Sequence, residues 1–206
     1  MARRTVENAW RRRGFLRVAG ADEVGRGSLA GPVVAAAVVL DPGARLPGLR
    51  DSKLLAASER ERLYAAITRT ACWAVAEASA ATVDRLNVHQ ASLDAIRRAL
   101  EALVPAPDFA IVDGFAVPGL RMPHEAVVGG DRRCAAIAAA SIVAKVTRDR
   151  EMTRLHALDP RYGFDRHKGY ATRAHLDAVA RFGYASEHRR SFRPAALAGR
   201  TTGSPA

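Results

Sequence analysis

Cysteine is scarce in this chain of 206 residues, which contains only Cys72 and Cys134. Two cysteines so far apart in the sequence make neither a CxxC pair nor a disulfide framework, so we expect both to be buried, reduced thiols. Long hydrophobic runs are also missing, and no apolar stretch reaches the roughly 20 residues that a membrane-spanning helix needs. These absences favour a soluble cytoplasmic protein, with no membrane as partner, over a secreted or membrane-inserted one.

Lysine is the second scarce residue, because arginine supplies all but three of the 32 basic side chains. The net charge of +11 lies at the two ends of the chain. Six Arg and one acid give +5 over residues 1–18, and nine basic residues and three acids give +6 over residues 161–206. Basic clusters attract polyanions, nucleic acid first among them. A solvated, arginine-rich surface that reflects a biased genome composition is the open alternative.

The order of strand-like and helix-like segments indicates an α/β protein, and the length allows one sizeable core. Residues 1–14 are expected to form a basic N-terminal arm or helix, and residues 195–206 a disordered tail. Strands are expected over residues 15–22, 33–40, 72–79, 109–112 and 126–128. Helices are expected over residues 58–68, around 93–103, over 134–144 and over 173–180, with a loop over 162–170.

The functional interpretation depends most on the stretch Ala19–Pro32. Asp22 and Glu23 end an apolar strand, and a glycine-arginine-glycine turn over residues 25–27 follows at once. Glycine lets the backbone approach a ligand closely and adopt positive φ, and the guanidinium of arginine suits phosphate. The stretch therefore predicts carboxylates that hold a hard cation, next to a turn that touches a phosphate or a sugar.

Four acids stand at the ends of predicted strands: Asp22, Glu23, Asp113 and Asp131. Ligands of open α/β sheets collect near strand ends, and carboxylates are the ligands that Mg²⁺ and Mn²⁺ prefer. Clustered carboxylates repel one another, so convergence implies bound metal or raised pKa values. Two metals about 3.5–4 Å apart can activate a water and stabilise the leaving oxygen of a phosphodiester. Taken singly, each acid has a simpler explanation, as a helix cap, a turn or a solvated strand end.

Other polar side chains are weaker candidates. Lys53 and Lys168 are placed to contact phosphate, whereas Lys145 could equally support the acids from a helix. His167 and His188 lack zinc-ligand spacing, so a solvated or phosphate-facing role is favoured. The serines lack the Gly-x-Ser-x-Gly context of a nucleophile.

From about residue 16 to residue 193 the chain resembles the ribonuclease HII family. Arg26 in the glycine turn, together with the lack of room for an extra N-terminal domain, favours this family over the related ribonuclease HIII type. The motifs that carry the resemblance are, in chain order, Ala19–Pro32, Asp51-Ser52-Lys53, Asp113-Gly114, Gly130-Asp131, Ala138–Asp149, His167–Thr172 and His188–Phe192.

The resemblance implies an RNase H-like fold over residues 15–194, with a five-stranded mixed sheet flanked by helices and a helical C-terminal portion. It implies a metal-dependent endonuclease that hydrolyses the RNA strand of RNA/DNA hybrids. It also implies nicking 5′ of a single ribonucleotide in duplex DNA, which leaves 3′-hydroxyl and 5′-phosphate ends and serves ribonucleotide excision repair and DNA replication. The implied cofactors are two Mn²⁺ or Mg²⁺ ions, the implied partners are hybrid and ribonucleotide-containing duplexes, and the implied state is a monomer.

The resemblance also assigns roles to the candidate residues. The four acids match the family's metal-binding and catalytic residues. Gly25, Arg26 and Gly27 match the turn whose backbone contacts the ribose 2′-hydroxyl, the group that distinguishes RNA from DNA locally. Tyr170 matches the tyrosine that packs on the following deoxyribose. Lys53 and Lys168 are assigned to phosphate.

Alternatives to these roles stay open. Tyr170 can be read as a partly buried aromatic residue, and Arg26 as the partner of Glu23 in a surface ion pair. A non-catalytic hybrid-binding module is one rival function, although a pure binder would not need all four acids. A DNA nuclease or an integrase-like strand transferase of the same superfamily is another, against which the ribose-sensing turn argues.

Overall fold

The computed structural model describes residues 4–195. Its centre is one mixed sheet of five strands in the order β3-β2-β1-β4-β5, which confirms the predicted sheet. β1 pairs antiparallel with β2, and β2 with β3, whereas β1–β4 and β4–β5 are parallel pairs. The strands are β1 (Val18–Val24), β2 (Val33–Val39), β3 (Cys72–Ala78), β4 (Phe109–Asp113) and β5 (His124–Val127).

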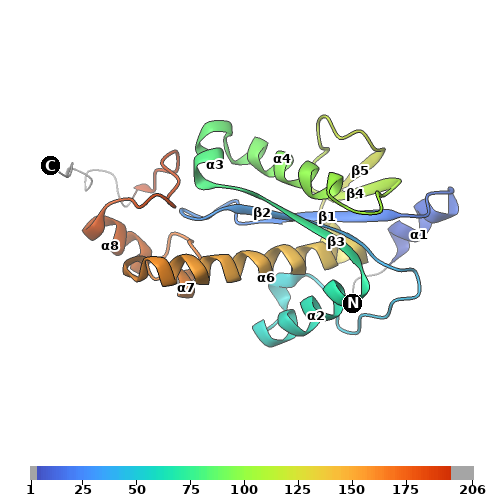
Figure 1. Ribbon diagram of the computed structural model, residues 1–206, viewed down its shortest axis with the longest axis horizontal. Helices are drawn as coiled ribbons and strands as arrows, with labels where there is room; N and C mark the ends of the chain where they lie inside the picture. The colour runs from blue at the N-terminus through green and yellow to red at the C-terminus, as the bar shows by residue number, and fades with distance from the viewer. Residues whose placement is uncertain (1–3, 196–206) are drawn as a thin grey trace.

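Helices cover both faces of the sheet, as Figure 1 shows, with α3 and α4 on one face and α2 and α6 on the other. All seven residues of β2 are buried, as expected for a strand covered on both faces. Among residues 4–195, no helix combines the length and apolar content needed to cross a membrane. The longer helices are α1 (Thr5–Arg12), α2 (Ala57–Thr70), α3 (Ala80–Leu86), α4 (Val88–Glu101), α6 (Ala135–Leu158) and α8 (Arg173–Phe182). The short ones are η1 (Ser52–Leu54), α5 (Gly130–Arg133), η2 (Pro160–Tyr162) and α7 (Phe164–His167).

The long helix α6 crosses the sheet at Gly20 of β1. A Cβ at Gly20 would lie 2.3 Å from the carbonyl carbon of Ala136, so only glycine allows this close approach. The helix runs on to Leu158, and its second half is charged, as the sequence from Lys145 onward indicates. That half carries the helical C-terminal portion, with α7 and α8 at the far end of the molecule from α1 (Figure 1).

Several element boundaries differ from those predicted. The first strand begins at Val18 rather than at residue 15, and α2 begins at Ala57, where the Glu59 carboxylate accepts from the Ala56 backbone N–H at 3.4 Å. Helix α3 was not predicted, although Ser79 caps it by accepting from the backbone N–H of Thr82. The predicted loop over residues 162–170 contains the short helix α7. Local hydrogen bonds, which the apolar pattern does not report, set these boundaries.

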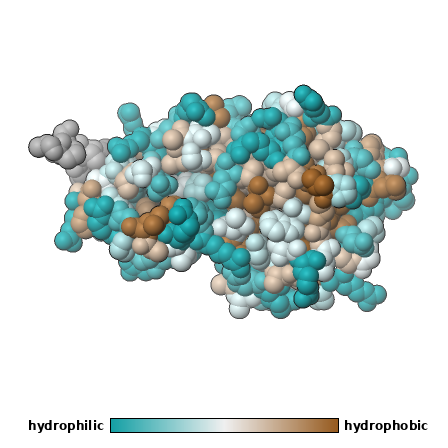
Figure 2. Space-filling model, in the orientation of Figure 1, coloured by the Kyte–Doolittle hydropathy of each residue, from teal (hydrophilic) through white to brown (hydrophobic). Residues whose placement is uncertain are grey.

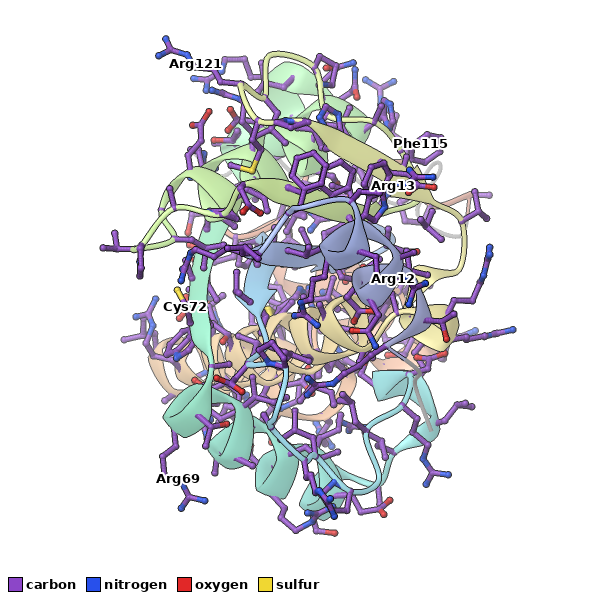
Figure 3. The ribbon with its side chains drawn as sticks, turned by 90° about the vertical axis from the view of Figure 1, so that its right-hand side faces the viewer. Arg12, Arg13, Arg69, Cys72, Phe115 and Arg121 are labelled. Carbon is purple, nitrogen blue, oxygen red and sulfur yellow. The ribbon has the colours of Figure 1, made fainter. Side chains whose placement is uncertain are left out.

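Both cysteines are free thiols, as expected. Cys134 is buried, and burial raises the pKa of its thiol well above the usual range. Cys72 is only partly buried, which corrects the expectation for this residue; it lies on the edge strand β3 (Figure 3). The surface around the elements is mainly hydrophilic on the face seen in Figure 2, with apolar residues in separate small groups.

The N-terminal helix α1 is joined to the core. Trp10 stacks on Phe109 of β4 with ring centroids 3.8 Å apart. Glu7 is 1% exposed, and its Oε1 accepts from the backbone N–H of Ala136 at 2.7 Å. This carboxylate serves as the missing side-chain cap of α6 and lies at the positive end of its dipole. Arg12 is exposed on the outer side of α1 (Figure 3), whereas most of the tail predicted over residues 195–206 lies outside the described residues.

Replacing Glu7 with Ala is expected to lower the free energy of unfolding by about 1–2 kcal/mol, the usual cost of losing a helix cap. Urea unfolding followed by circular dichroism measures the change. Glu7→Gln keeps an oxygen acceptor and should lose less, and Arg12→Ala on the same helix should be nearly neutral. Equal losses for Glu7→Ala and Arg12→Ala would show that the cap contributes nothing.

Candidate metal and nucleic-acid site

Parallel pairing of β1 and β4 brings two of the acids together. Ala21 pairs with Val112, so the next residue of each strand, Asp22 and Asp113, lies at the same edge of the sheet. Asp113 Oδ1 accepts from the backbone N–H of Gly130 at 2.7 Å, which ties β4 to the start of α5. The following residue of α5 is Asp131, the second residue of the helix and not its cap.

The acids influence one another electrostatically. Burial raises the pKa of Asp22 well above its usual value, and the charges of Glu23 and Asp113 raise it further. Burial also raises the pKa of Glu23, despite the opposing effect of Arg26. The pKa of Asp131 is raised by burial first and then by neighbouring carboxylates, Asp113 among them. The site is therefore short of positive charge.

Hydrogen bonds within the protein hold the Asp22 and Glu23 carboxylates in their present orientations. Asp22 Oδ1 accepts from the backbone N–H of Glu23 at 2.8 Å, and Glu23 Oε1 pairs with Arg26 Nη1 at 3.0 Å. Over residues 4–195, no three His, Cys, Asp or Glu side chains are gathered tightly enough to hold one metal ion. An all-carboxylate donor set still fits a hard divalent cation, provided that the side chains turn toward it. Metal binding by the four acids stays a prediction.

The two glycines of the turn have different surroundings. Gly25 has φ +93°, and a Cβ there would lie 2.2 Å from Nε of Arg148, so the protein itself requires glycine. Gly27 is exposed, and no described atom lies within 4 Å of the position that its Cβ would take. Open space at Gly27 leaves the backbone accessible to a ligand. The ion pair of Arg26 with Glu23, considered as an alternative, is present.

Tyr170 lies in the C-terminal portion but is connected to the same turn. The carbonyl of the preceding residue, Gly169, accepts from the backbone N–H groups of Leu29 at 2.8 Å and Ala30 at 3.2 Å. Tyr170 is 39% exposed, so it is partly buried, as in the alternative, but leaves part of its ring open to a ligand; the guanidinium carbon of Arg148 lies 5.7 Å from the ring centroid. The hydrogen bonds to the Gly169 carbonyl join the segment that follows the glycine turn to the residue that precedes the tyrosine.

The lysines occupy different environments. Lys53 is exposed and close enough to Asp131 to lower the pKa of that carboxyl, which offsets part of the upward shift. Lys168 Nζ donates to the Asp149 carbonyl at 3.3 Å, so contact with phosphate would compete with this bond. Lys145 pairs with the Asp149 carboxylate at 2.7 Å rather than with the site acids.

Three residues near the acids were not among the predicted site residues. Ser52 and Ser141 share a buried hydrogen bond of 2.9 Å between their hydroxyls, and the Ser141 hydroxyl opposes the upward pKa shift of Asp22. Asp51 is 3% exposed and helps to raise the pKa of Asp131. The Asp51-Ser52-Lys53 motif identified this loop in the sequence. The sequence did not indicate that the loop contacts α6.

Phe115 is a further neighbour that the sequence did not indicate. It follows the Asp113-Gly114 turn, is 53% exposed and lies at the molecular surface in Figure 3. Its ring centroid is 5.8 Å from the guanidinium carbon of Arg26. A second exposed aromatic face therefore borders the glycine turn, on the side of β4.

Comparison with known proteins gives a consistent result. The family model described as "Ribonuclease HII" matches residues 19–195. A ribonuclease HII of Ruegeria pomeroyi is 53% identical over 189 residues, which cover 91% of this chain and 81% of the relative. The crystal structure of ribonuclease H2 from Pyrococcus horikoshii OT3 superposes with a TM-score of 0.73 at 27% identity, covering 86% of this chain and 94% of that one. Bst-RNase HIII in complex with Mn²⁺ shares the fold, with a TM-score of 0.67, 23% identity and coverage of 86% and 67%.

Proposed function

This chain belongs to the ribonuclease HII family, whose members are metal-dependent ribonucleases H that cut the RNA strand of RNA/DNA hybrids, and from that premise we propose its finer activity. The enzyme nicks duplex DNA on the 5′ side of a single embedded ribonucleotide, leaving 3′-hydroxyl and 5′-phosphate ends. It acts as a cytoplasmic monomer with two divalent ions, Mn²⁺ or Mg²⁺, at the acid cluster.

The adjacency of Glu23 and Arg26 is the observation that supports this proposal most directly. Glu23 belongs to the acid cluster, Arg26 belongs to the glycine turn, and their side chains are 3.0 Å apart. A phosphate near the acids would therefore place its own sugar within reach of the turn. Cleavage chemistry and ribose recognition then act on the same nucleotide.

The acids have the role of holding the ions. Asp22, Glu23, Asp113 and Asp131 supply carboxylate oxygens, and the repulsion among them is relieved when cations bind. Two bound ions would supply an activated water and charge neutralisation at the leaving oxygen. Lys53, exposed beside Asp131, is placed to contact a phosphate, and a phosphate at Lys168 would compete with its hydrogen bonds to the Asp149 carbonyl and the Thr153 hydroxyl.

The turn and the tyrosine have the role of selecting the sugar pair. Open backbone at Gly27 gives donors and acceptors to a 2′-hydroxyl without reading a base. The exposed face of Tyr170 packs on the next sugar, where a 2′-hydroxyl would cost contact. Together they favour a ribose followed by a deoxyribose.

A gel assay on a DNA duplex with one ribonucleotide tests the proposal. Nicking 5′ of the ribonucleotide in Mg²⁺ or Mn²⁺, and none in EDTA, is the expected result. An all-DNA duplex of the same sequence should stay intact. Cutting of that duplex would favour the DNA-nuclease rival, and tight hybrid binding without any cleavage would favour the binding-module rival.

Replacing Tyr170 with Ala is expected to lower kcat/KM on the single-ribonucleotide duplex by roughly 10–100-fold, the range of one lost aromatic stacking contact. The loss on a uniform RNA/DNA hybrid should be much smaller, because a ribose follows the cleaved ribose there. Phe182→Ala, another partly exposed aromatic in α8, is the matched control. Equal losses on both substrates would remove the sugar-sensing role.

A further inference from the structure

Two arginine side chains are fully buried where the segment after the glycine turn meets the C-terminal portion. Arg148 of α6 and Arg189 near the C-terminal end are both 0% exposed. Within the described residues, neither forms an ion pair with a carboxylate. Arginine is almost never fully buried without such a partner, so these two side chains require a specific explanation.

Arg148 bonds to backbone on both sides of the proposed sugar-reading surface. Its Nε donates to the carbonyl of Pro32 at 2.9 Å, and its Nη2 to that of Ala30 at 3.2 Å. Its Nη1 donates to the carbonyl of Lys168 at 2.9 Å. One guanidinium therefore joins the segment that leaves the glycine turn to the segment that precedes Tyr170.

Arg189 holds the same segment from the other side. Its Nη1 donates to the carbonyl of Arg26 at 2.9 Å, within the turn itself. Its Nε and Nη2 both donate to the carbonyl of Gly31, at 3.1 and 2.9 Å. The backbone N–H of Arg189 donates to the carbonyl of Leu29 at 2.9 Å. Four consecutive peptide groups from residue 29 to residue 32 thus accept from one arginine or the other.

Burying these two guanidinium charges has an electrostatic cost. Burial, and to a smaller extent the nearby charge of Arg148, lowers the pKa of Arg189 to about 10. Burial likewise lowers the pKa of Arg148. Apolar residues of similar size would avoid that cost, but they could not donate to several carbonyls in fixed directions as a planar guanidinium does.

We propose that Arg148 and Arg189 are positioning residues for substrate selection, which fix the distance between the glycine turn and Tyr170. This inference rests on the proposed function, in which the turn reads a ribose and Tyr170 reads the next sugar. The two arginines contact neither sugar. They keep the glycine turn and Tyr170 one nucleotide step apart. Selectivity for a ribose followed by a deoxyribose depends on that spacing, whereas the acids are held by β1, β4 and α5.

Arg148→Lys and Arg189→Lys test the proposal, because lysine keeps the charge but not the fork of donors. Each is expected to reduce, by about tenfold or more, the ratio of kcat/KM on a single-ribonucleotide duplex to kcat/KM on a uniform hybrid. That size corresponds to the loss of one hydrogen bond to a charged group. Arg150→Lys, an exposed arginine on the same helix that pairs with Glu61, is the matched control and should leave the ratio unchanged.

A double-mutant cycle with Tyr170→Ala separates positioning from general destabilisation. If Arg148 acts through Tyr170, Arg148→Lys should change the substrate ratio little in the Tyr170→Ala background. Additive effects on the ratio would show that Arg148 does not act through Tyr170 and would contradict the proposal. Thermal unfolding of each variant shows whether it is folded. If Arg148→Lys does not fold, Arg189→Lys is used for the test instead.

The outcomes separate this inference from the proposed function. A wild-type enzyme without preference for the single-ribonucleotide duplex would overturn the proposed function, and this inference with it. A wild-type preference that survives in folded Arg148→Lys and Arg189→Lys would overturn the positioning role alone.

Discussion

Replacing Asp22 with Asn is expected to lower the rate of strand cleavage by roughly 10³-fold or more. Bound metal contributes several kcal/mol to the stabilisation of a phosphodiester transition state, and about 1.4 kcal/mol corresponds to a factor of ten. Asp22 is buried, and burial together with the charges of Glu23 and Asp113 raises its pKa well above the usual value. An amide there keeps one oxygen but loses the charge that attracts a cation.

Asp22→Asn should separate activity from binding and stability. Affinity for the duplex should change little, because the turn and Tyr170 remain. Without metal, the variant should be at least as stable as the wild type, since one of several repelling carboxylates is gone. Added Mn²⁺ should raise the melting temperature of the wild type, by mass action on the folded state, and raise that of the variant much less.

Nicking assays, equilibrium binding and thermal unfolding with and without Mn²⁺ measure these three quantities. Asp177→Asn, an exposed acid of α8 that pairs with Arg173, is the matched control and should behave as wild type in each. If Asp22→Asn nicks at the wild-type rate in Mg²⁺, the assignment of Asp22 to metal binding is wrong.

Acidification is expected to destabilise the protein through a buried histidine pair in the C-terminal portion. His188 Nδ1 accepts from the backbone N–H of Ala185 at 3.0 Å, so its proton is on Nε2, which donates to His175 Nε2 at 3.0 Å. His175 Nδ1 then donates to the carbonyl of Tyr170 at 2.9 Å. Neither ring can accept another proton without breaking one of these bonds, so the fold requires both to be neutral.

Burial, more than any other cause, lowers the pKa of His175 and of His188 to about 4, from 6.5. Neighbouring charges contribute to these values: His167 lowers the pKa of His175, while His175 and Arg190 lower that of His188 and Asp159 opposes the shift of His188. Because the unfolded chain takes up protons first, the stability that the pair contributes is complete above pH 6.5. It falls as the pH drops toward about 4, by roughly 2 kcal/mol per histidine at pH 5.

Urea unfolding at pH 7.5 and pH 5 of the wild type and of His188→Gln measures this contribution. A difference between the two proteins is needed, because the raised pKa values of the buried acids favour the folded state at low pH. The destabilisation caused by His188→Gln should shrink by roughly 2 kcal/mol at pH 5. A pH-independent cost of His188→Gln would contradict the prediction.

The five strands, and the positions of Asp22, Glu23 and Asp113 at the ends of β1 and β4, could be predicted from residue patterns, whereas Asp131 lies in the short helix α5. Continuous valine and alanine runs mark strands covered on both faces, and an acid directly after such a run must lie at a strand end. The glycine turn could be recognised from its residues in the same way. Helix α3 was missed, because a capping hydrogen bond and contacts with distant segments define it.

The sequence by itself determined the kind of protein, since strand runs, terminal acids and a Gly-Arg-Gly turn are local patterns that need no partner to be recognised. Only the tertiary structure decided which groups meet. It placed Glu7 on the end of α6, linked Ser52 to Ser141, and enclosed Arg148 and Arg189 around the turn. The physical reason is that a buried polar side chain is defined by the donor or acceptor it finds, and these partners are separated by long stretches of chain. The spacing of residues along the sequence does not show which of them form such pairs.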